Sequence, residues 1–395
     1  MSSWSYHPLG DNNRDQFISI VGESLNYPGT DIWLTYIERV GPENIRCVHA
    51  NDTCVGGLAF YRMGQWYGGN RVASAGISGV GIDPAHRGTG VCKALLQETL
   101  RELHEEKVSL GALYASTRRL YRSVGFELSG HQIQYSLMMH SFRADPVARE
   151  LPLTRITDPD PGVLAPIAEV RGRATNGNID RTPGLWARIF EPINRSTTTY
   201  LFGEPGNYEG FATMIQGNRD AGHPQPLVAA DWAANTPRAL QRMMHLLLDH
   251  RSMCDRFRWN GGPQDNLLMA AQEEHLEVSN ELLTLNRIIH FESALTERGY
   301  PMALQAELHF EVTDELLPGN SGKWILQVAD GVGRVQRGGS GAIKLDISSL
   351  VPLYTSMHTA SQLVAMGRIE CSEHAMLQLA DLVFGGPSPW TVELF

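Results

Sequence analysis

The sequence predicts an α+β protein made of three successive blocks, and two observations carry this prediction. In the first two blocks several short strands are followed by one long amphipathic helix, whereas in the third block strands come first and helices follow without regular alternation. A chain of 395 residues is also too long for one ordinary hydrophobic core. We therefore place a first domain at residues 1–145, a second at 146–285 and a third at 286–395.

The first block has the clearest pattern of apolar residues. Their spacing predicts a helix over residues 15–27, then strands over 46–82 that are separated by Asn-Asp and Gly-Gly turns. Residues 88–107 predict a long amphipathic helix. Its apolar face is formed by Val91, Leu95, Leu96, Leu100 and Leu103. The block closes with a strand, a short helix and another strand, over 110–116, 118–125 and 126–139.

In the second and third blocks the spacing of apolar residues and the positions of turn residues again predict strands and helices. The second predicts strands over 198–204, 208–217 and 226–234, then a helix over 236–253. Thr236 is the expected N-cap of that helix and Pro237 its first residue. The third block predicts strands over 287–298 and 302–314, Gly-rich hairpins over 318–348, and helical stretches over 349–367 and 372–385. The alternation of Trp390, Val392 and Leu394 predicts a terminal strand that ends at Phe395.

Composition excludes several classes of function. No apolar run approaches the roughly 20 residues that span a bilayer, and the N-terminus lacks the basic and apolar regions of a signal peptide. The five cysteines show no CxxC spacing and the 14 histidines no HxxxH pair, so we expect reduced thiols, no metal site and a cytoplasmic location. The formal charge of −10, with no Lys or Arg after Arg368, disfavours nucleic acid and suits cationic partners.

One segment carries a chemical motif. A strand that ends at Ile82 runs through Asp-Pro into Arg87-Gly88-Thr89-Gly90, and a long helix follows at once. Glycines at such a turn let backbone N–H groups face an anion, and the helix N-terminus adds partial positive charge. The segment is neither a Walker loop, since no Gly-Lys-Ser/Thr follows, nor a Rossmann fingerprint. It predicts a cradle for a pyrophosphate.

A second motif follows about thirty residues later, in "LYASTRRLYRSVGFE". The two motifs in this order resemble the GNAT superfamily of acetyl-CoA-dependent N-acetyltransferases. The resemblance implies that the main chain of Val80, Gly81 and Ile82 holds the pantetheine arm. It also implies that the turn and the first helical turn hold the pyrophosphate, through Arg87, Gly88, Thr89, Gly90, Val91, Cys92 and Lys93. Ser116 and Thr117 would line the reactive end of acetyl-CoA, and Tyr121 would be the general acid near its sulfur.

The whole organisation is similar to the Eis family of GNAT enzymes. Members have a catalytic GNAT domain, a second GNAT-like domain without cofactor and a C-terminal domain that resembles sterol carrier protein. The resemblance implies that the main-chain carboxylate of Phe395 is the general base, that aminoglycosides are acetylated at more than one amine, and that the protein forms hexamers. In the second block Asn235-Thr236-Pro237 replaces the glycine turn, so we expect no acetyl-CoA there.

Two other functions stay open on the sequence alone. The first is a protein lysine N-acetyltransferase, because an acidic surface suits lysine side chains and polyamines as well as aminoglycosides. The second is a binding or regulatory protein with a vestigial GNAT site, whose third domain holds a hydrophobic ligand. The intact Arg87-Gly88-Thr89-Gly90 turn and Tyr121 favour an enzyme over the second alternative.

Overall fold

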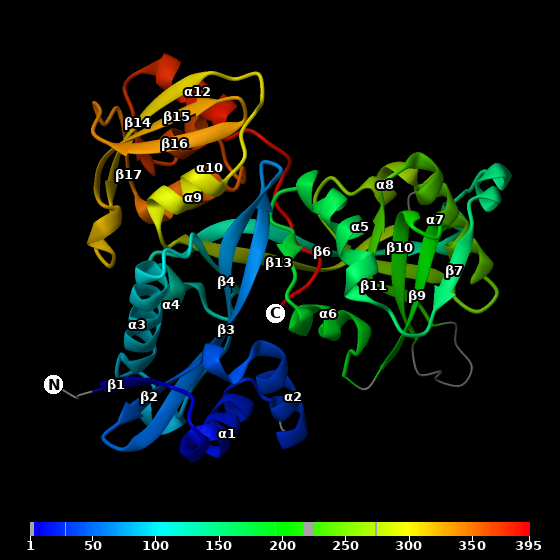
Figure 1. Cartoon of the computed structure of the whole chain (residues 1–395), viewed down its shortest axis with the longest axis horizontal. Coiled ribbons are helices and arrows are strands. Elements are labelled where there is room, and N and C mark those ends of the chain that lie inside the picture. Colours follow the sequence, from blue (N-terminus) through cyan, green and yellow to red (C-terminus); the bar gives the residue numbers. More distant parts are fainter. Residues whose placement is uncertain (1–3, 28, 194, 217–224, 273–274) are drawn as a thin grey trace. The chain divides into compact units, whose positions relative to one another are not determined.

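The chain forms two compact units. The computed structural model describes residues 4–27, 29–193, 195–216, 225–272 and 275–395 (Figure 1). Unit 1 comprises Met1–Gly130, Thr284–Pro387 and Leu394–Phe395, and unit 2 comprises His131–Leu283 and Ser388–Glu393. The chain passes from unit 1 to unit 2 within strand β6 (Glu127–Met138), returns within β13 (Leu276–Ile288), and enters unit 2 once more near its end.

The first sheet of unit 1 has the strand order β1-β2-β3-β4-β5-β13. Its other strands are β1 (Trp4–Pro8), β2 (Ile45–Ala50), β3 (Thr53–Tyr67), β4 (Asn70–Ile82) and β5 (Leu110–Tyr114). The helices are α1 (Arg14–Ser24), α2 (Thr30–Val40), α3 (Val91–Glu105) and α4 (Arg118–Arg122). The expected helix over 88–107 is thus confirmed, and each residue of its predicted apolar face is at most 1% exposed. Helix α2 was not expected from the sequence.

The C-terminal part of unit 1 is a second sheet with the order β16-β15-β14-β17-β18. Its strands are β14 (Ala306–Thr313), β15 (Gly322–Ala329), β16 (Val332–Arg337), β17 (Ile343–Asp346) and β18 (Ile369–Glu370). The helices are α9 (Phe291–Glu297), α10 (Ile347–Tyr354), α11 (Ala360–Ala365) and α12 (His374–Val383). Figure 1 shows these elements in yellow to red. The helices and the sheet enclose one core of aromatic and aliphatic side chains.

Three sequence predictions for the third block are wrong. Residues 287–298 are not one strand, because Phe291, Ala294 and Leu295 have helical spacing and are buried as one face of α9. The stretch 349–367 is not one helix but the end of α10 and the separate α11, which Thr359 caps anew. The described chain has no strand at its C-terminus; only an isolated bridge pairs His131 with Trp390.

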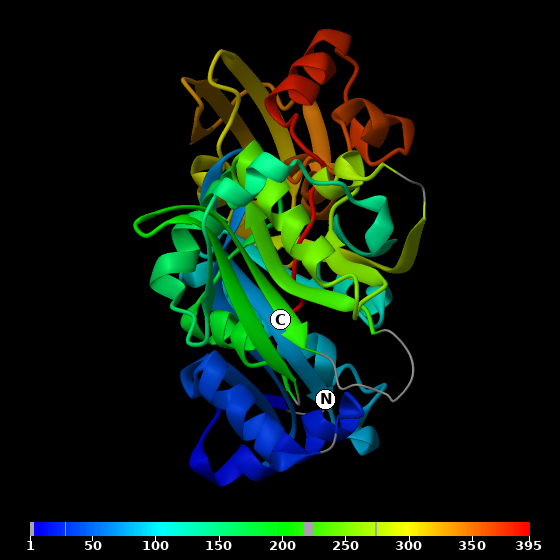
Figure 2. The same cartoon turned by 90° about the vertical axis from the view of Figure 1, so that its right-hand side faces the viewer.

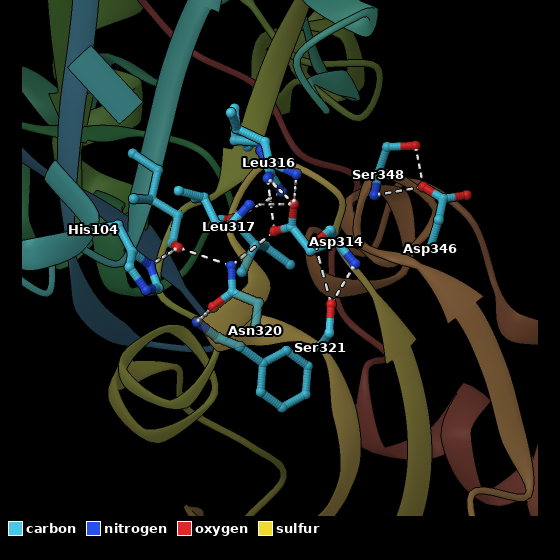
Figure 3. A network of polar contacts seen from close by, with 12 residues as sticks. His104, Asp314, Leu316, Leu317, Asn320, Ser321, Asp346 and Ser348 are labelled. Carbon is cyan, nitrogen blue, oxygen red and sulfur yellow. Dashed lines mark hydrogen bonds and ion pairs between the residues drawn. The ribbon is translucent and has the colours of Figure 1, made fainter. Parts of the chain in front are cut away.

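A buried polar network fixes this sheet to the first sheet of unit 1 (Figure 3). Asp314 lies at its centre and accepts hydrogen bonds from Arg287 Nη2 at 2.7 Å to both carboxylate oxygens and from Asn320 Nδ2 at 2.9 Å. The carbonyl of Ile289 also accepts from Asn320 Nδ2 at 2.9 Å and from His104 Nδ1 of α3 at 2.7 Å. The network therefore joins α3, β13 and the loop after β14 as one body.

In unit 2 the strands follow the order β6-β12-β11-β10-β9-β7 and are drawn mainly in green (Figure 2). Besides β6, unit 2 contains β7 (Leu153–Ile156), β9 (Ser196–Glu204), β10 (Asn207–Gln216), β11 (Leu227–Ala234) and β12 (Arg256–Gly261). Short β8 (Ile179–Asp180) and the helices α5 (Pro161–Arg173), α6 (Pro183–Phe190), α7 (Pro237–Asp249) and α8 (Asn266–Ala270) complete the unit. The three predicted strands correspond to β9, β10 and β11, except that residue 217 lies outside the described residues.

Helix α7 begins as the sequence predicts. The Thr236 side chain accepts a hydrogen bond from the N–H of Ala239, and Pro237 is the first helical residue. Helices α5 and α6 were not expected, and α5 carries Pro166 in its interior. Among the described residues no helix is both long and apolar enough to cross a membrane.

Candidate active site

The first feature of the site is an open strand edge in unit 1. Strand β4 pairs in parallel with β5 only from Ser74 to Gly76, although it continues to Ile82. On its other side it pairs with β3 up to Ile82, with a register shift between Gly57 and Ala59. The last part of β4 therefore has β3 on one side and a diverging strand on the other. Such an edge can accept an extended ligand that bonds as an added strand would.

The turn after β4 is built by local hydrogen bonds. The Asp83 carboxylate accepts from the N–H of Ala85 at 2.8 Å. Arg87 folds back, and its Nε donates to the carbonyl of Ile82 at 3.0 Å while Nη2 bonds Ser24 Oγ of α1 at 3.2 Å. Part of the Arg87 guanidinium thus closes the turn, and the carbonyl of Ile82 is already occupied.

The start of α3 fits an anion. Gly88 and Gly90 have φ angles of +78° and +90°, which side chains rarely adopt, and a Cβ at either position would meet nothing within 4 Å. No side chain caps the helix at Gly90. The first N–H groups of a helix lack intrahelical partners, so this end presents unpaired donors and positive partial charge to open space. Val91 is buried, so it can contribute only its main chain.

Tyr121 lies on α4, next to the start of α3. The side chain is buried with only 7% exposed, and its ring meets the Phe126 ring edge-on at 6.0 Å. Burial raises the pKa of the Tyr121 phenol above its ordinary value, with smaller contributions from Cys92 and Tyr114. The hydroxyl makes no hydrogen bond to the described residues. Tyr121 is therefore a neutral, protonated donor at neutral pH whose hydroxyl is available to a ligand.

Gly125 shows why a glycine follows α4. Its φ is +87°, and a Cβ there would lie 2.7 Å from Arg287 Nε. Arg287 is fully buried, and its Nη2 donates hydrogen bonds to the Asp314 carboxylate. The position of α4 thus depends on a side chain from β13, and through it on the C-terminal sheet.

Phe395 reaches the point where β4 and β5 diverge. Its ring lies edge-on to the ring of Tyr114, the last residue of β5, with centroids 6.1 Å apart. A Cβ on Gly76, the last residue of β4 that pairs with β5, would be 3.0 Å from Phe395 Cδ2. Tyr114 thus contacts Phe395 and also influences the pKa of Tyr121. The sequence analysis missed Tyr114, although an aromatic residue at the end of a strand was a usable signal.

A groove of about 720 Å³ lies between α1 and α2. Asp15 and Glu23 of α1 and Trp33 of α2 contribute to its lining. Among the residues that the structure describes, neither carboxylate has a salt-bridge partner. Trp33 is linked to β4 through Tyr36, since its ring lies 5.2 Å from the Tyr36 ring and the Tyr36 hydroxyl bonds Ser78 Oγ at 2.7 Å. The sequence analysis did not anticipate these acidic residues.

The other predicted site residues fall into two groups. Val80 is half-buried on the free part of β4, and Gly81 is tightly packed, since a Cβ there would lie 2.9 Å from Val21 Cα. Thr89, Lys93, Ser116 and Thr117 are exposed on the loops and helix starts around the opening. Cys92 is half-buried, and burial raises the pKa of its thiol to about 11, so it remains a small neutral thiol. Among the described residues no cluster could hold a metal ion.

Comparison with protein families agrees with this architecture. Residues 5–129 and 177–288 each match an acetyltransferase (GNAT) domain, and residues 291–392 match a sterol carrier protein domain. The matched ranges leave the proposed boundaries at 145 and 285 as predictions.

Individual relatives cover the full chain. N-acetyltransferase Eis of Mycobacterium tuberculosis is 24% identical over 97% of this chain and 96% of its own length. The crystal structure of a GCN5-related N-acetyltransferase from Anabaena variabilis has 32% identity, covers 100% of both chains and superposes with a TM-score of 0.93. Eis1 from Mycobacterium abscessus shares the fold at 19% identity, a TM-score of 0.81 and complete coverage of both chains.

The chain belongs to the GCN5-related N-acetyltransferases. Its open strand edge, its uncapped glycine turn and its buried tyrosine agree with this class of enzyme. Its reaction is acetyl transfer. Among these enzymes it is a homologue of the Eis N-acetyltransferases, with two GNAT domains followed by a sterol carrier protein-like domain. The family resemblance and the α+β fold expected from the sequence are both confirmed.

Proposed function

We propose that the protein transfers the acetyl group of acetyl-CoA directly to primary amines of a cationic small molecule, an aminoglycoside in particular. The observation that carries the proposal is the convergence at the β4–β5 opening. Tyr121 has a protonated hydroxyl that bonds none of the residues described by the structure, and Phe395 packs against Tyr114 and Gly76 at the same opening.

Acetyl-CoA supplies a thioester carbonyl and a thiolate leaving group. Its pyrophosphate fits the open N–H groups that follow Gly88 and Gly90, with Lys93 and the remaining donors of Arg87 close in sequence. Val80 and Gly81, with the neighbouring main chain of Ile82, offer the strand edge for the pantetheine arm. Ser116 and Thr117 lie on the loop between β5 and α4. In the proposal they line the reactive end of acetyl-CoA.

Two proton transfers define the roles of the protein. An alkylammonium with a pKa near 10 must lose a proton before its nitrogen can form the new C–N bond. In the proposal, the Phe395 carboxylate accepts that proton, directly or through a water. As the C–S bond breaks, Tyr121, whose phenol is protonated near pH 7, gives its proton to the sulfur.

The acidic groove supports a polycationic substrate. Asp15 and Glu23 line a groove of about 720 Å³ and are free to pair with ammonium groups. Glu393, one of the carboxylates after Arg368, is paired with Arg181 and is therefore not free to bind a cationic substrate. A wide groove with more than one carboxylate suits several amines of one molecule, but a lysine side chain could also enter it. A protein lysine N-acetyltransferase is therefore the second candidate.

A competition assay separates the two candidates. Acetyl-CoA is mixed with equal concentrations of an aminoglycoside, spermidine and a lysine-containing peptide, and products are followed by mass spectrometry. We expect at least a tenfold higher kcat/KM for the aminoglycoside and more than one added acetyl group. Preference for the peptide would favour the second candidate. Failure of acetyl-CoA to bind in calorimetry would revive the vestigial-site alternative. Assembly as a hexamer and a cytoplasmic location remain proposals drawn from the Eis family.

A further inference from the structure

The segment Ser388–Glu393 is bound within unit 2 by residues far from it in the sequence. Its main chain is hydrogen-bonded at Trp390 by Asn176 O (2.9 Å) and Asn178 Nδ2 (3.0 Å), and at Val392 by Gln132 Nε2 (2.8 Å) and Asn260 Nδ2 (2.9 Å). The main chain of His131 adds hydrogen bonds to Pro389 and Thr391. Side chains and main chain together thus replace the ladder of a terminal strand. The segment is therefore specifically anchored.

Glu393, two residues before the chain end, has the strongest contact. Its carboxylate pairs with the Arg181 guanidinium in a two-pronged arrangement, Oε1 to Nε at 2.5 Å and Oε2 to Nη2 at 2.7 Å. The Arg181 side chain is 2% exposed and that of Glu393 12%. A bidentate charged pair fixes orientation as well as distance.

Arg181 belongs to a closed circuit of contacts. Its Nη1 lies 2.8 Å from Asp231 Oδ2, and Asp231 Oδ1 lies 2.6 Å from Arg171 Nη1. Arg171 Nε donates to Asn178 Oδ1 at 3.1 Å, and Asn178 donates in turn to the carbonyl of Trp390. The circuit thus begins at Glu393 and ends at Trp390, both in the segment Ser388–Glu393. It contains two arginines and two carboxylates.

The burial of these charges distinguishes the circuit from a surface ion pair. Asp231 is fully buried on β11, and the Arg181 guanidinium stacks over the Trp186 ring at 4.5 Å. Buried charges are tolerated only when they are paired. Loss of the Glu393 carboxylate would leave the Arg181 guanidinium without one of its two carboxylate partners and would destabilise unit 2. A chain end is otherwise prone to fraying.

We propose that Arg181 is a positioning residue for acetyl transfer, acting through Glu393 to fix the end of the chain. Only Leu394 separates Glu393 from Phe395, so holding Glu393 restricts where the terminal carboxylate can lie. The GNAT-like domain of unit 2 would thereby serve the reaction as the anchor of the tail. This inference rests on the proposed role of the Phe395 carboxylate.

The test combines two changes in the full-length protein. Glu393→Gln keeps the side-chain length but removes the charge that Arg181 holds. The second change adds one glycine after Phe395, which displaces the terminal carboxylate. We expect E393Q to lower kcat about tenfold in the native chain while KM for acetyl-CoA changes less than twofold. In the chain with the added glycine, E393Q should change kcat by less than twofold, because the group it positions is already displaced.

The outcomes separate this inference from the proposed function. If the added glycine alone leaves kcat unchanged, the Phe395 carboxylate is not the base and the proposed function fails on that point. If the glycine lowers kcat but E393Q does not, only the positioning role is overturned. An equal loss from E393Q in both chains would reveal a merely structural effect and would also overturn it.

Matched variants guard against general destabilisation. Glu209→Gln removes a carboxylate of similar exposure, 10%, that also pairs with an arginine in unit 2, and it should leave kcat unchanged. Arg181→Lys retains one charged contact to Glu393 and should lose less activity than Arg181→Gln. If R181Q does not fold, E393Q and R181K still decide the question. Equal kcat for R181K and R181Q, both folded, would contradict a role through the ion pair.

Discussion

The starts of α3 and α7 occupy the same place in two GNAT-type domains, yet they are built in opposite ways. Before α3, Gly88 and Gly90 leave open space and no side chain caps the helix. Before α7, Thr236 bonds the N–H of Ala239, and Pro237 removes another donor. One helix start keeps its N–H groups for a ligand, whereas the other satisfies them within the protein.

A carboxylate at α7 extends the contrast. Glu209 of β10 accepts a hydrogen bond from the Thr236 hydroxyl at 2.6 Å and pairs with the Arg238 guanidinium. The second domain therefore carries its own anion beside the helix start, where the first domain is open to one. The comparison teaches that glycines and an open anion position occur together at α3, whereas α7 has neither. It supports one acetyl-CoA site per chain.

The largest effect on kcat should come from a substitution of Tyr121, since this residue belongs to the domain with the open helix start. Tyr121→Phe removes the proton donor and should lower kcat at least 100-fold, the usual range for loss of a general acid. Steady-state kinetics at saturating acetyl-CoA measures it. Tyr6→Phe is the control, because the Tyr6 hydroxyl of the same domain is bonded to Glu102 at 2.5 Å and should not affect kcat. Near-normal turnover of Y121F would remove the acid assignment.

A smaller effect should come from the glycine turn itself. Gly90→Ala places a side chain at a φ of +90° and beside the open N–H groups, so KM for acetyl-CoA should rise about tenfold. Gly206→Ala in unit 2 is a close match, with a φ of +82° and equally open surroundings. It imposes the same backbone strain away from the turn and should leave KM unchanged. Equal KM for both variants would mean that the turn does not hold the cofactor.

The sequence predicted the helix start at α3 because every signal there is local. The glycines, the apolar face from Val91 to Leu103 and the later Gly125 lie within forty residues and need no distant partner to be recognised. The reason for Gly125 was not predictable, because Arg287 lies more than 150 residues away in the sequence. Arg287 in turn depends on Asp314, a contact that no spacing rule encodes.

The C-terminal segment was mispredicted for the same physical reason. Alternation of Trp390, Val392 and Leu394 favours a strand, but the segment is held by Asn178, Asn260 and other distant side chains. Trp390 packs on Gly262, where a Cβ would approach to 2.5 Å, so its burial reflects a local fit rather than a sheet face. The pairing of Glu393 with Arg181 likewise joins residues more than 200 positions apart.

The smallest effect should be a pH dependence of the free energy of unfolding that arises from Glu209, the carboxylate beside the start of α7. Hydrogen bonding to Arg238 and then Thr236 holds the pKa of Glu209 below its ordinary value, against the opposing effect of burial. A carboxyl whose pKa is lower in the folded state stabilises the fold above its unfolded pKa, near 4.3, and loses that contribution as pH falls through the folded value. Wild-type protein should thus lose more unfolding free energy than Glu209→Gln between pH 6 and pH 3. Because Arg238 is exposed, the difference should stay below about 1 kcal/mol. Denaturant unfolding at both pH values measures it, and parallel curves would show that Glu209 does not act as the internal anion of α7.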